Sequence, residues 1–167
     1  VLVHANTRHT TDELRAMLER SGVTLLLASK DQLERLEAVP VRSLTNRVRL
    51  DDLTGGRSAA PVNPEPRMAT GDSVLAWLMY TSGTTGVPKG VMLTHRSLIA
   101  AALNTTMARP VADDEVYLFP FPLFHVAAYN VVHHHLRRRP VVLLPSFEPV
   151  AAMNAIATER VTSVSLA

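Results

Sequence analysis

Short apolar runs alternate along the chain with longer stretches in which apolar residues recur every three or four positions. The short runs have the length of strands covered on both faces, and the longer stretches have the period of amphipathic helices. This alternation is typical of βαβ units and predicts an α/β fold with a mainly parallel sheet flanked by helices. The predicted strands are residues 1–3, 23–28, 41–44, 73–80, 91–93, 115–119, 140–144 and 161–166. The predicted helices are residues 11–21, 31–37, 95–108, 126–137 and 148–159.

Local signals support several of these boundaries. Thr10 and Glu13 have the spacing of a capping box, and Gly22 is suited to end the helix that follows. Thr94 can cap the helix that begins at His95. Residues 54–71 are rich in Gly and Pro, so they predict an exposed loop. Because the βα rhythm resumes directly afterwards, an excursion from one domain is favoured over a linker between two domains.

Composition excludes several classes of protein. Seventeen Lys and Arg against 15 Asp and Glu give a formal charge of only +2, and these residues are scattered. The chain has no basic stripe with interleaved aromatic residues, so no nucleic-acid partner is expected. Cysteine is absent, which excludes disulfides, thiolate metal sites and Cys nucleophiles and is compatible with a reducing cytosol.

No targeting or membrane segment is visible. The longest apolar run, residues 74–80, is far shorter than the roughly 20 residues of a transmembrane helix. The first residues lack the basic and apolar regions of a secretory signal. We expect a cytoplasmic location, with peripheral membrane attachment left open. The chain starts with Val, which indicates a segment of a longer protein, although a Val-coded start stays open.

The most informative segment follows the predicted strand 73–80 and reads YTSGTTGVPKG over residues 80–90. Its glycines let backbone N–H groups turn toward a ligand, its hydroxyls add hydrogen-bond donors, and Lys89 adds a mobile positive charge. Such a loop is suited to a polyphosphate. It is not a common P-loop, because Gly rather than Ser or Thr follows the lysine and the chain then runs extended.

The string YTSGTTGVPKGVMLTHRSL closely resembles the signature of the adenylate-forming superfamily, which includes acyl-CoA synthetases, luciferases and peptide-synthetase adenylation domains. FPLFHVAA and VVLLPSFEPVAAMNAIATERVTSV resemble later segments of the same family, so the likeness covers nearly the whole chain. The resemblance implies part of the N-terminal, AMP-binding domain of an acyl-CoA synthetase-like fold over residues 1–167, without the C-terminal lid domain.

Enzymes of this family activate a carboxylate with ATP to an acyl-adenylate and then pass the acyl group to a thiol, commonly that of coenzyme A. The resemblance implies ATP, Mg²⁺ and coenzyme A as cofactors, with most Mg²⁺ ligands outside this segment, and a carboxylic acid, most simply a fatty acid, as substrate. Lys89 would stabilise the departing pyrophosphate. The residues matched to phosphate binding are Thr81, Ser82, Gly83, Thr84, Thr85, Gly86 and Lys89.

Histidines give two further expectations. His125 matches a family position beside the reacting carboxylate and the thiol channel and is a candidate catalytic residue, while Phe124 and Val126 could line an acyl pocket or pack in the core. His133, His134 and His135 are consecutive and point about 100° apart on a helix, so they cannot converge on one metal ion. We predict a solvated helix face for these three histidines and no metal site. The family usually has a Gly-containing turn where this chain reads Arg139-Pro140.

The family's adenine-binding and ribose-binding segments, hinge and C-terminal domain have no counterpart in the 167 residues. The chain alone is therefore expected not to complete the reaction without the remainder of its polypeptide. Two other interpretations stay open: a segment of an amino-acid adenylation domain, and a non-catalytic nucleotide-binding remnant.

Overall fold

The computed structural model describes residues 1–37, 40–54, 73–81, 88–144 and 146–166, and the chain divides into two compact units. The first unit comprises residues 1–71 and 80–91, and the second comprises residues 72–79 and 92–167. The boundary at residue 71 falls directly after the Gly- and Pro-rich segment. The predicted excursion, residues 54–71, falls outside the described part of the chain apart from its first residue.

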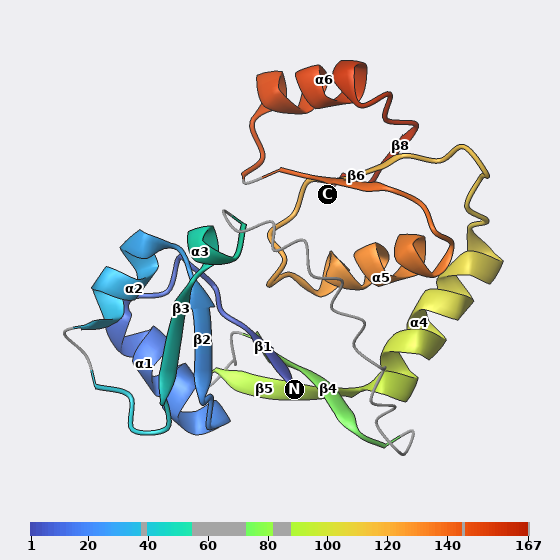
Figure 1. Ribbon diagram of the computed structural model, residues 1–167. Coiled ribbons are helices and arrows are strands. Elements are labelled where there is room, and N and C mark those ends of the chain that lie inside the picture. Colours follow the sequence, from blue (N-terminus) through green and yellow to red (C-terminus); the bar gives the residue numbers. More distant parts are fainter. Residues whose placement is uncertain (38–39, 55–72, 82–87, 145, 167) are drawn as a thin grey trace. The chain divides into compact units, whose positions relative to one another are not determined.

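The first unit begins with alternating strands and helices, as predicted (Figure 1). Thr10 and Glu13 form the predicted capping box, and Gly22 adopts the left-handed conformation, with φ of 64°, that ends the first helix. Strands β2 and β3 pair in parallel, with Leu25 opposite Asn46. The elements are β1 (Leu2–His4), α1 (Thr11–Ser21), β2 (Leu25–Ala28), α2 (Lys30–Glu37), β3 (Asn46–Arg49) and α3 (Leu50–Thr54).

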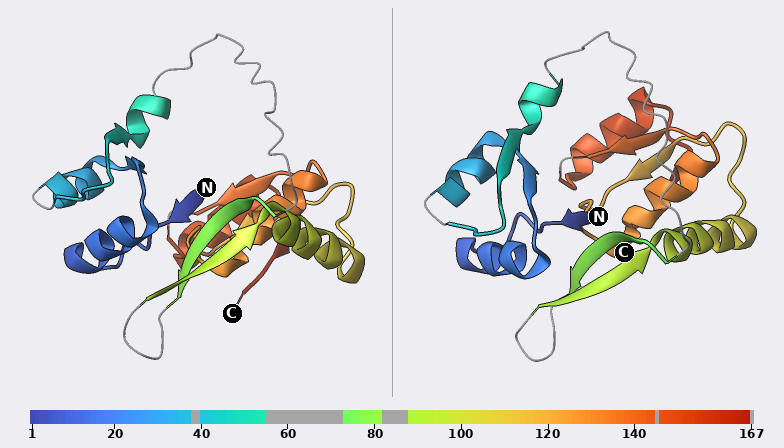
Figure 2. Two further views of the ribbon diagram at one scale, coloured as in Figure 1. Left: turned by 90° about the horizontal axis from the view of Figure 1, so that it is seen from below. Right: turned by 60° about the horizontal axis from the view of Figure 1, so that its bottom comes forward.

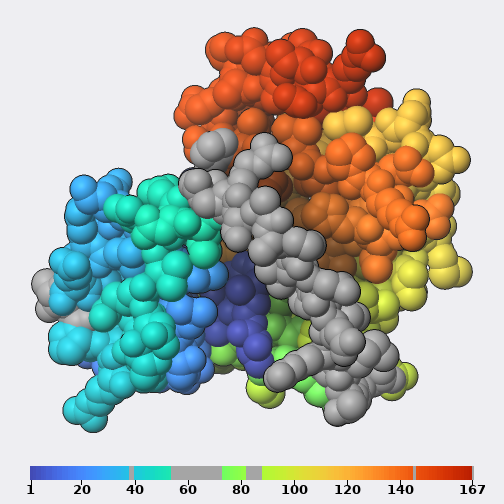
Figure 3. All heavy atoms as spheres, in the orientation of Figure 1, coloured from blue at the N-terminus to red at the C-terminus, as the bar shows by residue number. Residues whose placement is uncertain are grey.

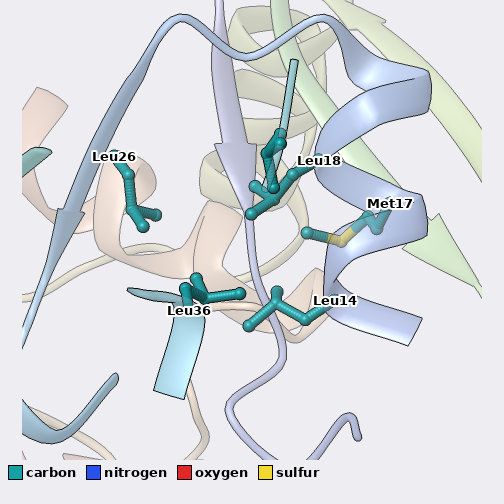
Figure 4. Packing of buried hydrophobic residues seen from close by; sticks show 6 residues of the cluster. Leu14, Met17, Leu18, Leu26 and Leu36 are labelled. Carbon is teal, nitrogen blue, oxygen red and sulfur yellow. The ribbon is translucent and has the colours of Figure 1, made fainter. Parts of the chain in front are cut away.

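A single cluster of apolar side chains forms the core of this unit. Figure 4 shows side chains from α1, β2 and α2 directed toward one another. The helical stripe predicted from the sequence supplies half of the cluster, because residues three and four apart share one helix face. The buried members are Leu14, Met17, Leu18, Leu26, Leu36 and Val41.

One predicted strand is wrong. Residues 41–44 form a turn, Val41 packs into the core, and the strand lies instead at Asn46–Arg49. The Asn46 N–H donates to the Thr24 carbonyl at 3.0 Å as the ladder with β2 begins. Among the described strands β3 pairs only with β2, so charged side chains can project to solvent from it. Its sequence lacks the apolar alternation by which strands are recognised. Helix α3 was not predicted.

The second unit contains a three-stranded sheet in the order β7-β6-β8, and both strand pairs are parallel. Tyr117 of the central strand lies opposite Val141 on one side and Ser163 on the other. Helix α6 lies at the surface (red-orange in Figure 3), where Val150 and Met153 are exposed. The elements are α4 (His95–Ala108), β6 (Tyr117–Phe119), the 3₁₀ helix η1 (Val126–Ala128), α5 (Tyr129–Leu136), β7 (Val141–Leu143), α6 (Pro149–Thr158) and β8 (Ser163–Val164).

Two strands, β4 (Leu75–Thr81) and β5 (Lys89–Thr94), contain residues of both units and belong to a sheet in the order β1-β4-β5. Apart from residues 41–44, each predicted strand and helix has a counterpart within a few residues, so the α/β prediction is confirmed. None of the described helices is both long enough and apolar enough to cross a bilayer.

The predicted solvated face of the histidine run is wrong for two of its three members. His133 and His134 are fully buried, whereas His135 is exposed. Helix α5 packs against α4, and Asn130, His133 and His134 have the i, i+3, i+4 spacing of one helix face. That face is the buried one although its residues are polar, and a hydropathy pattern cannot reveal it.

The backbone just after α5 adopts an unusual conformation. Arg138 adopts a left-handed backbone with φ of 55°, and its N–H donates to the His135 carbonyl. A side chain in this region costs on the order of 1 kcal/mol relative to glycine. The resemblance implies a Gly-containing turn at Arg139-Pro140, and here the residue before that dipeptide, Arg138, adopts the left-handed conformation.

We expect His133→Leu to stabilise the protein by about 1 kcal/mol at neutral pH, because neither ring nitrogen of His133 has a hydrogen-bond partner among the described residues. Burial and the nearby charges of His134 and Arg109 lower the pKa of His133 below its ordinary value of 6.5. As pH falls below 6.5, the unfolded chain binds a proton that the folded chain resists, so stability falls. The variant should lack this part of the pH dependence in urea denaturation.

The matched control is His135→Leu, which makes the same change at an exposed position one residue along the same helix. Its free energy of unfolding should stay within about 0.5 kcal/mol of the parent. A destabilised His133→Leu variant with an unchanged pH profile would show that the buried ring is held by favourable interactions.

Candidate nucleotide-binding site

The two ends of the predicted phosphate loop are neighbouring strands of one sheet. Figure 2 shows β4 and β5 side by side, and the sheet order confirms that they are adjacent. Thr81 is the last residue of β4 and Lys89 the first of β5, and both are exposed. The structure therefore places Thr81 and Lys89 at the ends of two neighbouring strands, on either side of the connection. The other predicted phosphate ligands, Ser82, Gly83, Thr84, Thr85 and Gly86, lie outside the described residues.

The strand that leads into the loop is held firmly at its end. Tyr80 packs against the apolar core of the first unit, and its hydroxyl lies 3.5 Å from the Met17 carbonyl oxygen. The exposed Thr81 follows directly. The partly buried Tyr80 next to the exposed Thr81 hydroxyl fixes where the connection leaves the sheet.

Lys89 is a cation without a competing anion in the described part of the chain. No ion pair or hydrogen bond of its side chain occurs among the described residues. The only other lysine of the sequence, Lys30, pairs with Glu34 at 3.6 Å. An exposed ammonium without a carboxylate partner is available to an anionic ligand.

The chain after Lys89 follows the path that distinguishes this loop from a P-loop. It stays extended through β5 to Thr94, whose Oγ1 accepts from the Ser97 N–H at 3.1 Å and caps α4. A P-loop lysine would instead lie at the start of its helix. The predicted extended run and the predicted cap are both confirmed.

His125 lies in the second unit on an exposed turn that fixes its ring. Its Nδ1 accepts from the Ala127 N–H at 3.1 Å, and its ring stacks on Phe121 with centroids 5.2 Å apart and an interplanar angle of 20°. Because Nδ1 accepts, the neutral ring must carry its proton on Nε2. In this state Nε2 can donate to a carboxylate or phosphate oxygen but cannot accept a proton.

The exposure of Phe124 and Val126 bears on whether these residues pack in the core. Val126 is 62% exposed, so it is not a core residue. Phe124 is half-buried. Sequence reasoning missed Phe121, which makes the stacking contact. The signal was the recurrence of Tyr117, Phe119 and Phe121 at every second position, which places three aromatic rings on one side of an extended segment.

No group of three or more metal-ligating side chains among the described residues is arranged to hold a metal ion. The described part of the chain thus offers hydroxyl and ammonium groups for an anion at the β4–β5 connection, and an imidazole N–H at His125.

Comparison with known proteins decides the family. Residues 1–167 match the family described as AMP-binding enzyme. The chain belongs to the AMP-binding enzyme family. Membership confirms the resemblance, which residues 80–98 and the later segments carry over nearly the whole chain.

Relatives in this family carry the names of CoA ligases. A feruloyl-CoA synthase from Amycolatopsis sp. is 35% identical over 166 residues, which cover 98% of this chain and 33% of that protein. Long-chain-fatty-acid–CoA ligase FadD13 from Mycobacterium tuberculosis is 31% identical over 96% of this chain and 33% of its own length. The chain thus spans about a third of the curated relatives it matches.

Solved structures agree with the fold. The inhibitor-bound N-terminal domain of FACL13 from Mycobacterium tuberculosis matches with a TM-score of 0.86 and 30% identity, over 97% of this chain and 42% of that one. The o-succinylbenzoate CoA synthetase of Bacillus subtilis in complex with ATP and magnesium ion matches with a TM-score of 0.80 and 26% identity, over 98% and 33% of the two chains. The fold of this AMP-binding chain is that of acyl-CoA synthetase N-terminal domains.

Proposed function

We propose that this chain is part of the N-terminal domain of an ATP-dependent acid–thiol ligase, which forms an acyl-adenylate and passes the acyl group to coenzyme A. The observation that carries the proposal is that Thr81 ends β4 and Lys89 begins the neighbouring strand β5, on either side of a glycine- and hydroxyl-rich connection, in a member of the AMP-binding family. The lid domain and most Mg²⁺ ligands would be supplied by the rest of a longer polypeptide.

The first step brings two anions together, so positive charge near the phosphates lowers its barrier. Lys89 would hold the β- and γ-phosphates and stabilise the pyrophosphate as it leaves. Ser82, Gly83, Thr84, Thr85 and Gly86 would donate hydrogen bonds to the same oxygens, with Thr81 at the loop's entry. Bound Mg²⁺ would neutralise phosphate charge during this step. The 167 residues by themselves would bind the nucleotide without completing turnover.

His125 would contribute at the reacting carboxylate. His125 is an exposed residue, and the hydrogen bond at Nδ1 holds the tautomer with its proton on Nε2. It would therefore orient the acid by donating a hydrogen bond rather than act as a base.

The acid is proposed to lack an amino group. The relatives are named for ferulate, long-chain fatty acids and 2-succinylbenzoate, which are organic acids rather than amino acids. A fatty acid is the first candidate. An aryl acid resembling ferulate is the second, because the feruloyl-CoA synthase is 35% identical.

The test is ATP–pyrophosphate exchange by the longer protein that contains this segment, measured with fatty acids, hydroxycinnamates, 2-succinylbenzoate and a set of amino acids. We expect exchange with an apolar acid and none above background with amino acids. Exchange with amino acids alone would assign the segment to an amino-acid adenylation domain. Exchange with no acid, together with no binding of MgATP, would leave a non-catalytic remnant.

A further inference from the structure

A buried cluster of polar side chains joins three elements of the second unit. The Glu115 carboxylate accepts from Ser163 Oγ of β8 at 2.5 Å and from the Ala112 N–H at 3.1 Å, and it lies 3.0 Å from His134 Nε2 of α5. The side chain of His134 is 0% exposed and that of Glu115 is 12% exposed. Because His134 is fully buried and Glu115 is held by three hydrogen bonds, both side chains have little freedom to move.

Both nitrogens of the His134 ring are engaged. Nδ1 lies 2.7 Å from the Asn130 carbonyl oxygen, which can only accept, so Nδ1 carries a hydrogen. One proton lies between Nε2 and the Glu115 carboxyl group, and a hydrogen bond forms whichever of the two groups carries it. The imidazole plane is thereby fixed at two points.

A row of aromatic rings leads away from this fixed plane. Tyr117 stacks on His134 with centroids 4.1 Å apart and an angle of 6° between planes. Tyr117 also contacts Phe119 at 6.5 Å, Phe119 contacts Phe121 edge to face at 5.8 Å, and Phe121 stacks on His125 at 5.2 Å.

The first rings of the row cannot shift independently. Tyr117 and Phe119 are each 1% exposed, and protein interiors are packed too densely to absorb the movement of a ring. Displacing the ring of His134 must therefore displace Tyr117, and the displacement passes along the row. The last two rings lie nearer the surface, where His125 is exposed.

We infer that Glu115 and His134 are positioning residues that set the ring orientation of His125 through the aromatic row of Tyr117, Phe119 and Phe121. The consequence for turnover rests on the proposed function of His125, whereas the geometric link does not. A misplacement of about 1 Å at a reacting group can lower turnover about a hundredfold. The buried pair would thus act on a group whose ring it does not touch.

The test compares Tyr117→Leu, which interrupts the row, with Tyr117→Phe, which keeps the ring and removes a hydroxyl that has no partner among the described residues. The first readout is ¹⁵N NMR of the histidine rings in the 167-residue chain. We expect the parent and Tyr117→Phe to show His125 as the Nε2–H tautomer with ring contacts to Phe121. In Tyr117→Leu, His125 should show mixed tautomers and weaker contacts.

The second readout is kcat in the longer protein, which should fall about 10- to 100-fold in Tyr117→Leu, with an unchanged KM for ATP and recovery in Tyr117→Phe. Val131→Ala serves as the control, because Val131 packs against the same cluster but lies outside the row. It should lower stability without altering the His125 spectrum. Glu115→Gln keeps the shape of the side chain and decides the question by the same spectrum if Tyr117→Leu does not fold.

Identical His125 spectra in Tyr117→Leu, Glu115→Gln and the parent would overturn the inference. An altered spectrum with unchanged kcat would retain the link and show that His125 does not take part in turnover. If the longer protein shows no exchange with any acid, the proposed function fails while the NMR comparison still decides the positioning role.

Discussion

Lys89→Ala is expected to lower ATP–pyrophosphate exchange by the longer protein about 10- to 100-fold while leaving the stability of the 167-residue chain unchanged. A hydrogen bond to a charged group contributes about 1.5–3 kcal/mol, and each 1.4 kcal/mol corresponds to a factor of ten. Lys89 is exposed and has no side-chain hydrogen bond or ion pair among the described residues, so its removal takes little from the fold.

The sequence provides its own control. Lys30 is the only other lysine, and it lies on α2 paired with Glu34. Lys30→Ala should leave exchange unchanged and alter the free energy of unfolding by less than about 0.5 kcal/mol. Equal rates for the parent, Lys89→Ala and Lys30→Ala would remove Lys89 from the phosphate site.

Glu115→Ala is expected to lower the free energy of unfolding by about 3 kcal/mol, the largest stability loss among the variants considered. Removing this carboxylate leaves the buried His134 ring and the partly buried Ser163 hydroxyl without their partner. Breaking a buried pair on one side costs about 3–5 kcal/mol, and partial exposure of Glu115 places the effect at the lower end.

The same residue gives a pH dependence with a definite sign. Burial by itself would raise the pKa of Glu115, but hydrogen bonds from Ser163, His134 and a backbone N–H outweigh burial and lower the pKa below 4.5. The carboxylate therefore stabilises the fold above pH 4.5, and its contribution disappears as pH falls through the lower pKa of the folded state.

Asp114→Ala is the matched control for Glu115→Ala, because Asp114 is the adjacent acidic residue, is exposed, and has no hydrogen bond or ion pair of its side chain among the described residues. Urea denaturation should show little change for it at any pH. Similar stability for Glu115→Ala and Asp114→Ala would show that the buried cluster contributes nothing to the fold.

The order of strands and helices was predictable because most of them follow simple patterns of burial. Leu14, Met17 and Leu18 lie on one helix face, and continuous apolar runs mark strands β6 and β7. Two features escaped prediction because their residues are polar. Strand β3 is polar yet pairs in a ladder, and the α5 face with His133 and His134 is polar yet buried.

The candidate site was predictable in residue type but not in geometry. A cluster of Gly, Ser and Thr ending in Lys89 indicates an anion site wherever it occurs after a strand. The row of rings that links His134 to His125 depends on contacts between α5 and β6, and those contacts follow from the tertiary fold. No spacing in the sequence shows that His134 faces Tyr117 rather than solvent.

The most direct test of the central claim uses the two lysines of the 167-residue chain. Reductive ¹³C-methylation gives one NMR signal each for Lys30, Lys89 and the N-terminal amine. Titration with MgATP should shift the Lys89 signal in a saturable way and leave the Lys30 signal in place. A Lys89 signal that stays fixed through the whole titration, or moves only together with that of Lys30, would contradict a phosphate-binding role for the β4–β5 connection.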